Sequence, residues 1–116
     1  MTAGELIAAV DELRPNQYDT EQKLLWLREL DGKLILEGRG EAECRLEPYT
    51  EATVLFAPFP YNWELYIAWL FCQIDLHNAE ILKYNQSMTL FTAAWRQLVD
   101  YWNRKREPGL FRRWKL

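Results

Sequence analysis

The chain has 116 residues, of which 49% are hydrophobic and 15% aromatic, with a formal net charge of −3 at pH 7. This composition suffices for one domain with its own core and excludes a chain that is disordered throughout. The sequence has neither a long apolar run nor a basic, signal-like start, so we expect no membrane span and no secretory signal. Cys44 and Cys72 lack metal-site spacing and are expected to be reduced thiols.

The charges are divided unevenly along the chain. Residues 1–102 hold eight Lys/Arg and sixteen Asp/Glu, whereas residues 103–116 hold six Lys/Arg and one Glu. This asymmetry is typical of a folded body with a differently charged interaction tail. We therefore expect a helical domain over residues 1–106 and a basic, aromatic C-terminal tail over residues 107–116.

Two helix starts are marked near the N-terminus. Thr2 and Glu5 have the spacing of a capping box, which predicts a short helix that ends before Pro15. Asp19, followed three residues later by Gln22, predicts the start of a second helix with a broad apolar face. Both signals place polar groups where the first backbone N–H groups of a helix lack partners.

The end of the second helix is ambiguous at Asp31-Gly32. Gly32 is either a glycine tolerated inside a helix that continues to Leu36 or the turn of a hairpin into a strand at Lys33–Leu36. We favour the helix.

Glu37 to Pro60 reads as one long irregular segment because it contains glycines, prolines and clustered glutamates. Short strands are possible at Cys44–Leu46 and Thr53–Phe56, where part of the loop would pair with another surface. We expect Gly38–Thr53 to be poorly ordered in the isolated protein and to become ordered in an assembly.

Tyr61–Lys105 contains neither glycine nor proline and shows a continuous helical stripe. One unbroken helix would be roughly 65 Å long, which is too long for a core of this size. We favour a break at Asn85–Ser87, where Asn85 would end one helix and Ser87 would cap the next, although the continuous stripe favours a single helix. The fold prediction is therefore all-α, a bundle of about four helices. The stripe comprises Ile67, Leu70, Ile74, His77, Ile81, Tyr84, Met88, Phe91, Trp95, Leu98 and Trp102.

The sequence shows no pattern that predicts catalysis. A Gly-rich phosphate loop, a Ser-nucleophile motif and a Cys/His cluster are all missing, so we expect no enzyme, no cofactor and no metal. His77 and Glu80 have the spacing of half a metal site, but we interpret His77 as a histidine on the buried stripe that bonds to a neighbour. Asp75 and Glu64 are expected to be solvated, and Cys72 to be packed in the core.

The basic and aromatic C-terminus is the predicted contact region. Its cations can neutralise nucleic-acid phosphates while its aromatic rings stack on bases. Alternatively, the aromatic rings can anchor the tail on an acidic protein partner. The third interpretation is a mobile, solubilising end. The candidate partner-binding residues are Arg104, Lys105, Arg106, Phe111, Arg112, Arg113, Trp114 and Lys115.

Much of the chain outside Glu37–Val54 and the tail resembles small head–tail connector, or adaptor, proteins of Firmicutes tailed phages and prophages. The most specific matches are the words QID at Gln73–Asp75, KYN at Lys83–Asn85 and YWNR at Tyr101–Arg104. These words are structural and not catalytic. The tail Glu107–Leu116 departs from the family, whose members end in a shorter and less basic segment.

The resemblance implies a mostly helical adaptor that assembles into a ring, typically dodecameric, beneath the portal of a filled capsid. The ring would contact the portal and tail-side proteins and extend a channel in which DNA is only cargo, with no membrane partner. Its location would be the virion, and the host bacterial cytoplasm during assembly. Two other functions fit the residues: a helical nucleic-acid-binding or regulatory domain that uses its tail, and a homodimeric helical module.

Overall fold

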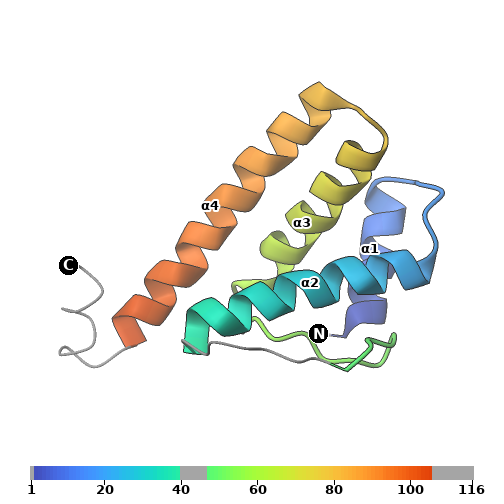
Figure 1. Cartoon of the computed structure of the whole chain (residues 1–116). Coiled ribbons are helices and arrows are strands. Elements are labelled where there is room, and N and C mark those ends of the chain that lie inside the picture. Colours follow the sequence, from blue (N-terminus) through green and yellow to red (C-terminus); the bar gives the residue numbers. More distant parts are fainter. Residues whose placement is uncertain (1, 40–46, 106–116) are drawn as a thin grey trace.

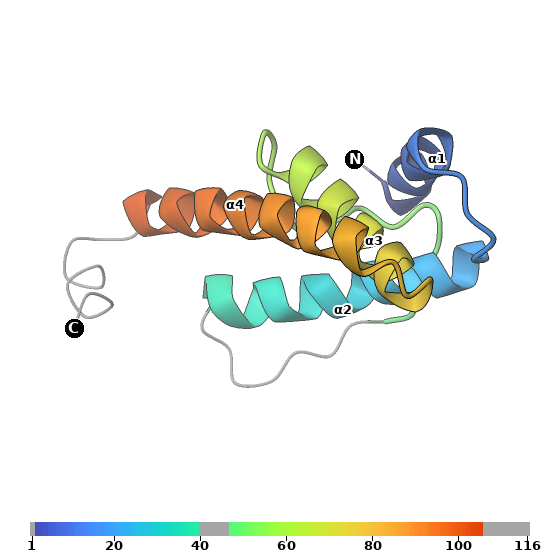
Figure 2. The ribbon, with the colours of Figure 1, turned by 90° about the horizontal axis from the view of Figure 1, so that it is seen from above.

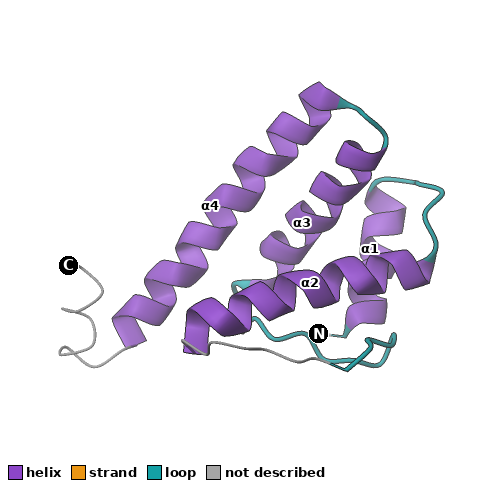
Figure 3. Ribbon diagram, in the orientation of Figure 1, coloured by secondary structure: helices purple, strands orange, loops and turns teal. Residues whose placement is uncertain are grey.

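The computed structural model describes residues 2–39 and 47–105, and the fold in this part of the chain is all-α (Figures 1 and 3). The prediction of a small four-helix fold is confirmed. None of the described helices is both long and apolar enough to cross a membrane. The helices are α1 (Ala3–Leu13), α2 (Thr20–Arg39), α3 (Asn62–His77) and α4 (Ile81–Lys105).

The helix α3 is the centre of the fold because it contacts each of the other three helices. It forms an antiparallel hairpin with α4, and α2 crosses this pair (Figures 1 and 2). The helix α1 packs near the N-terminal half of α2. Most of the length of α3 is buried, which explains its nearly continuous apolar sequence. Its largest fully buried side chains are Tyr66, Leu65, Leu70 and Ile74.

The start of α1 is capped from two directions. The predicted capping box is confirmed: the Thr2 hydroxyl accepts from the Glu5 N–H, and the Glu5 carboxylate accepts from the Thr2 N–H, both at 3.3 Å. The long loop supplies the carbonyls of Thr53 and Glu51, which accept the next helical N–H groups at 2.8 and 2.9 Å. A Cβ on Gly4 would lie only 2.9 Å from the Glu51 Cβ, so this close approach requires glycine.

The strand expected at Thr53–Phe56 is therefore wrong. Within the described residues this segment forms only an isolated bridge between Thr2 and Val54, and its Thr53 carbonyl caps α1. The other expected strand, Cys44–Leu46, lies outside the described residues.

The helix α2 begins as predicted and continues through Gly32. The Asp19 carboxylate accepts a bond of 2.8 Å from the Gln22 N–H, which confirms the predicted cap. The hairpin alternative at Gly32 is wrong, and the helix continues beyond Leu36 to Arg39. The irregular segment is correspondingly shorter than the predicted Glu37–Pro60.

The predicted break at Asn85–Ser87 is wrong because the chain reverses earlier, between His77 and Ile81. The Glu80 N–H donates to the Asp75 carbonyl at 2.9 Å, and the Ala79 N–H donates to the Leu76 carbonyl at 3.1 Å. These two bonds form a Schellman motif, whose left-handed position is occupied here by Ala79 at φ 58°. Glycine or asparagine usually occupies that position, so an alanine gave no stop signal.

A buried carboxylate ties the described part of the loop to the helices. The Asp31 carboxylate on α2 accepts from the hydroxyls of Tyr49 and Tyr66, each at 2.5 Å, and from the Phe56 N–H at 3.1 Å. The Tyr66 hydroxyl also accepts from the Ala57 N–H at 2.8 Å. Burial raises the pKa of Asp31 above its usual value, and the hydrogen bonds from these donors offset only part of this increase. Burial and the neighbouring Asp31 also raise the pKa of Tyr66, so its hydroxyl remains a donor.

The segment Gly38–Thr53, which we expect to be poorly ordered in the isolated protein, takes part in these contacts through its second half. Residues 40–46 of that segment lie outside the described residues. Residues 47–53 contribute Tyr49 to the Asp31 network and Thr53 to the cap of α1. Part of the loop therefore belongs to the fold of a single chain.

We expect Tyr66→Phe to lower the free energy of unfolding by roughly 1–3 kcal/mol, because it leaves the Ala57 N–H and one oxygen of Asp31 buried without a partner. Tyr18→Phe is the control, since the Tyr18 hydroxyl donates to Asn78 at an exposed position. Urea denaturation of the two variants and the parent protein measures both losses. Equal losses in the two variants would contradict a structural role for the Asp31 network.

Candidate assembly surface

Two of the predicted contact residues, Arg104 and Lys105, lie in the last turn of α4, and Arg104 contacts Tyr61 at the start of α3. Arg104 donates a hydrogen bond of 3.3 Å to the Tyr61 hydroxyl, and the Lys105 ammonium lies 5.2 Å from the centre of the Tyr101 ring. The rings of Tyr61 and Tyr101 are 4.8 Å apart. The other candidate residues lie outside the described residues: Arg106, Phe111, Arg112, Arg113, Trp114 and Lys115.

Asp75 is fully buried, so the expectation that it is solvated is wrong. One guanidinium nitrogen of Arg14, at the end of α1, lies 2.7 and 2.6 Å from its two carboxylate oxygens. The hydroxyl of Ser87, on α4, donates to the same carboxylate at 2.8 Å. A buried carboxylate requires such partners, because removing it from water costs several kcal/mol. Asp75 therefore joins the end of α1 and the first half of α4 to α3, whereas Glu64 is exposed as expected.

Arg14 also fixes the position of the end of α1 over the α3–α4 hairpin. Its guanidinium carbon lies 4.1 Å from the centre of the Phe71 ring, a cation–π contact. Leu13, the preceding residue, is 64% exposed. The ion pair thus holds an uncovered apolar side chain beside α3.

An open groove of about 330 Å³, here called the Trp63 groove, is lined by Leu13 and by residues of α3 and α4. Leu90 and Trp63 are 62% and 43% exposed, which is unusual for such large apolar side chains on one continuous surface. The charged residue of its lining is Glu64. The lining consists of Leu13, Trp63, Glu64, Ile67, Ala68, Phe71, Leu90, Ala93, Ala94 and Gln97.

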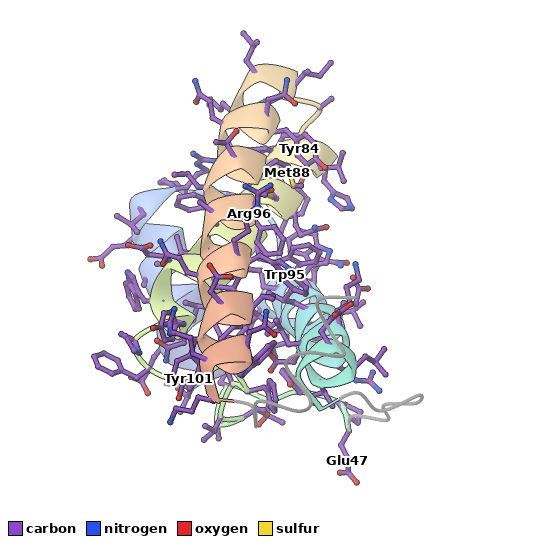
Figure 4. All side chains as sticks on the ribbon, turned by 90° about the vertical axis from the view of Figure 1, so that its left-hand side faces the viewer. Glu47, Tyr84, Met88, Trp95, Arg96 and Tyr101 are labelled. Carbon is purple, nitrogen blue, oxygen red and sulfur yellow. The ribbon has the colours of Figure 1, made fainter. Side chains whose placement is uncertain are left out.

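A second groove, of about 220 Å³, lies between α4 and α2 and is here called the Trp95 groove. Figure 4 shows Met88 and Trp95 on the side of α4 nearer to α2. The rings of Trp69, Phe91 and Trp95 contact one another in sequence, with centroid distances of 5.3 and 5.9 Å. The Lys33 ammonium lies 5.3 Å from the Trp69 ring. The aromatic side chains of this groove thus pack against one another, whereas Leu13, Trp63 and Leu90 of the Trp63 groove are largely exposed.

The turn between α3 and α4 carries further exposed apolar side chains. Leu76, Ile81 and Leu82 are all exposed at this end of the hairpin. Ile81 was predicted to belong to the buried stripe, and that prediction is wrong because the chain reverses before it. The hairpin therefore exposes apolar surface both at its tip and along the Trp63 groove.

Two residues of α3, His77 and Cys72, were considered for metal binding or reactivity, and both are placed for structural roles. His77 bonds through Nδ1 to the Gln73 carbonyl at 2.8 Å, as expected for a contact with a neighbour. Its side chain is nevertheless exposed, and its ring centre lies 5.1 Å from that of Trp26. Its predicted burial is wrong. Cys72 is buried as expected, and burial raises the pKa of its thiol to about 12, which disfavours the reactive thiolate. Within residues 2–39 and 47–105, no group of three or more potential metal ligands occurs.

The chain matches no protein-family model, no curated protein and no solved structure. The sequence pattern predicts contacts in the tail and did not reveal the Trp63 groove. Trp63 and Leu90 did carry a signal, since both lie off the stripe that defines the buried face.

We expect Ser87→Ala to lower the free energy of unfolding by about 1.5–3 kcal/mol, because Asp75 loses a donor that it cannot replace with water. Thr89→Ala, two residues away, is the matched control. The Thr89 hydroxyl donates to the Asn85 carbonyl of its own helix at an exposed position, so its loss should cost less than about 0.5 kcal/mol. Denaturant unfolding measures both values. A Ser87→Ala cost as small as that of Thr89→Ala would show that Ser87 is dispensable for Asp75.

Proposed function

We propose that this chain is the subunit of a phage or prophage head–tail connector that assembles as a ring beneath the portal and joins capsid to tail. The observation that carries the proposal is the uncovered apolar surface of the α3–α4 hairpin, which favours a role in assembly. The same hairpin carries the three words by which the sequence resembles connector proteins. A subunit of this kind would act in the host bacterial cytoplasm during assembly and then remain in the virion.

The shape of the exposed surface suits a ring. A ring requires a heterologous contact, in which one patch of a subunit meets a different patch of the next. The Trp63 groove and the hairpin tip with Leu76, Ile81 and Leu82 are two distinct apolar patches on one subunit. A dodecameric ring in contact with portal and tail-side proteins remains the form that the family resemblance implies.

The charge distribution is compatible with DNA as cargo. The body carries twice as many acidic as basic residues, sixteen against eight in residues 1–102. A channel lined by such subunits would repel the phosphate backbone and let DNA pass without adhering. The connector needs neither a cofactor nor a catalytic residue for this role.

The alternative function is a small helical nucleic-acid-binding or regulatory domain. Exposure of Arg104 and Lys105 at the end of α4, directly before the basic tail, favours this alternative. Gel filtration with and without duplex DNA separates the two functions. A connector subunit self-associates or binds a portal and ignores free DNA, whereas a DNA-binding domain shifts with DNA in a salt-dependent way.

We expect removal of residues 110–116 to leave the thermal midpoint nearly unchanged and to weaken assembly. The described core residues lie between Ala3 and Leu98, so the truncation removes none of them. Assembly with itself or with a portal is measured by sedimentation velocity, and the midpoint by circular dichroism.

Two tail variants identify which side chains matter. Phe111→Ala with Trp114→Ala should weaken assembly almost as much as the truncation, because desolvated aromatic anchors contribute more than rim charges. Replacing Arg112, Arg113 and Lys115 is the comparison. Unimpaired assembly by the truncated protein, together with DNA binding by the full chain that falls steeply as salt rises, would favour the nucleic-acid function.

A further inference from the structure

We propose that the Trp63 groove receives the C-terminal tail of a second copy of this chain, with Phe111 and Trp114 as its anchors. The inference rests on the proposed connector function, because it names the contact by which one subunit holds the next. It assigns a receiving site to a segment whose partner surface the sequence leaves open.

The groove offers what a basic, aromatic segment needs. Its walls are apolar, and Leu13, Leu90 and Trp63 are more than two-fifths exposed, so an aromatic side chain inserted there would displace water from both surfaces. Glu64 supplies an exposed carboxylate in the lining. A cation beside an inserted aromatic ring would therefore meet an opposite charge.

The aromatic wall already holds one guanidinium. Arg14 lies over the Phe71 ring at 4.1 Å while its charge is paired with Asp75. Trp63, at the other end of the lining, has exposed indole surface with no described cation over it. An arginine of the tail, Arg112 or Arg113, could occupy a comparable position over Trp63.

Chain length allows the tail to reach the groove of either copy. Gln97, the groove residue of α4 nearest to its end, precedes Lys105 by eight residues, a distance of about 12 Å along the helix. The six residues from Lys105 to Phe111 span up to about 20 Å when extended, which exceeds this distance. The proposed ring requires a contact between subunits, so we assign the groove to the tail of the next copy. The crosslinking test below separates this contact from one within a single copy.

The second copy also agrees with the way α4 ends. Arg104 bonds to Tyr61, and the rings of Tyr61 and Tyr101 are in contact, so the last described turn is held against the start of α3. The last described residue before the tail therefore has a fixed position. From Lys105, nine residues lead to Trp114, a reach of up to about 30 Å. This reach is sufficient to cross a subunit boundary.

Photo-crosslinking of the full-length protein tests the proposal. The photoreactive residue p-benzoylphenylalanine replaces Phe111, and light and ¹⁵N-labelled copies are mixed before assembly and illumination. Mass spectrometry then identifies each adduct and shows whether it joins two copies. We expect adducts between copies on the α4 segment from Leu90 to Gln97 and on Trp63.

A matched pair of substitutions on α4 provides the control. Leu90→Glu should reduce the yield of inter-copy adducts by about tenfold or more, because a carboxylate in the groove would be desolvated by the inserted ring. Thr89→Glu places the same charge on the neighbouring exposed position, outside the groove lining, and should leave the yield within about twofold.

Three results would overturn the proposal: groove adducts only within one copy, adducts only outside the groove, or equal yields in the Leu90→Glu and Thr89→Glu proteins. Sedimentation of the same samples separates this failure from failure of the proposed function. Normal assembly without groove adducts removes the inference and retains the ring. A full chain that neither self-associates nor binds a portal removes the connector function itself.

Discussion

The buried carboxylate of Asp75 is the interaction on which the arrangement of α1, α3 and α4 depends. A charge enclosed by protein is tolerated only with well-placed partners, and removing one partner of such a pair typically costs about 3–5 kcal/mol. Arg14 and Ser87 must therefore stay within hydrogen-bonding distance of one site on α3. The Asp31 carboxylate fixes residues 49–57 to α2 and α3 in a similar way. Two buried acids thus hold most of the described segments together.

The same ion pair builds the candidate assembly surface. By holding Arg14 over Phe71, Asp75 places the exposed Leu13 beside the hairpin and completes the Trp63 groove. The stability of the subunit and the shape of its contact surface are therefore linked.

Local signals predicted the starts of α1 and α2, whereas the features that the sequence did not reveal depend mainly on distant contacts. The caps at Thr2 and Asp19 act within three residues, so their spacing was sufficient to predict them. Asp75 looked solvated because its partners lie 61 and 12 residues away. The turn at Ala79 was missed because an alanine holds a left-handed conformation that glycine or asparagine usually marks. The Trp63 groove requires α1 to meet the hairpin, which no periodicity specifies.

A double-mutant cycle on Arg14→Met and Asp75→Asn tests the central role of this ion pair most directly. Urea unfolding of the parent, the two single variants and the double variant gives the coupling energy between the two side chains. If the pair fixes α1 to the hairpin, the coupling should be at least about 1.5 kcal/mol, with the double variant losing little more stability than Asp75→Asn alone. Losses that add to within about 0.5 kcal/mol would show that the two residues act independently and would contradict the dependence of the fold on Asp75.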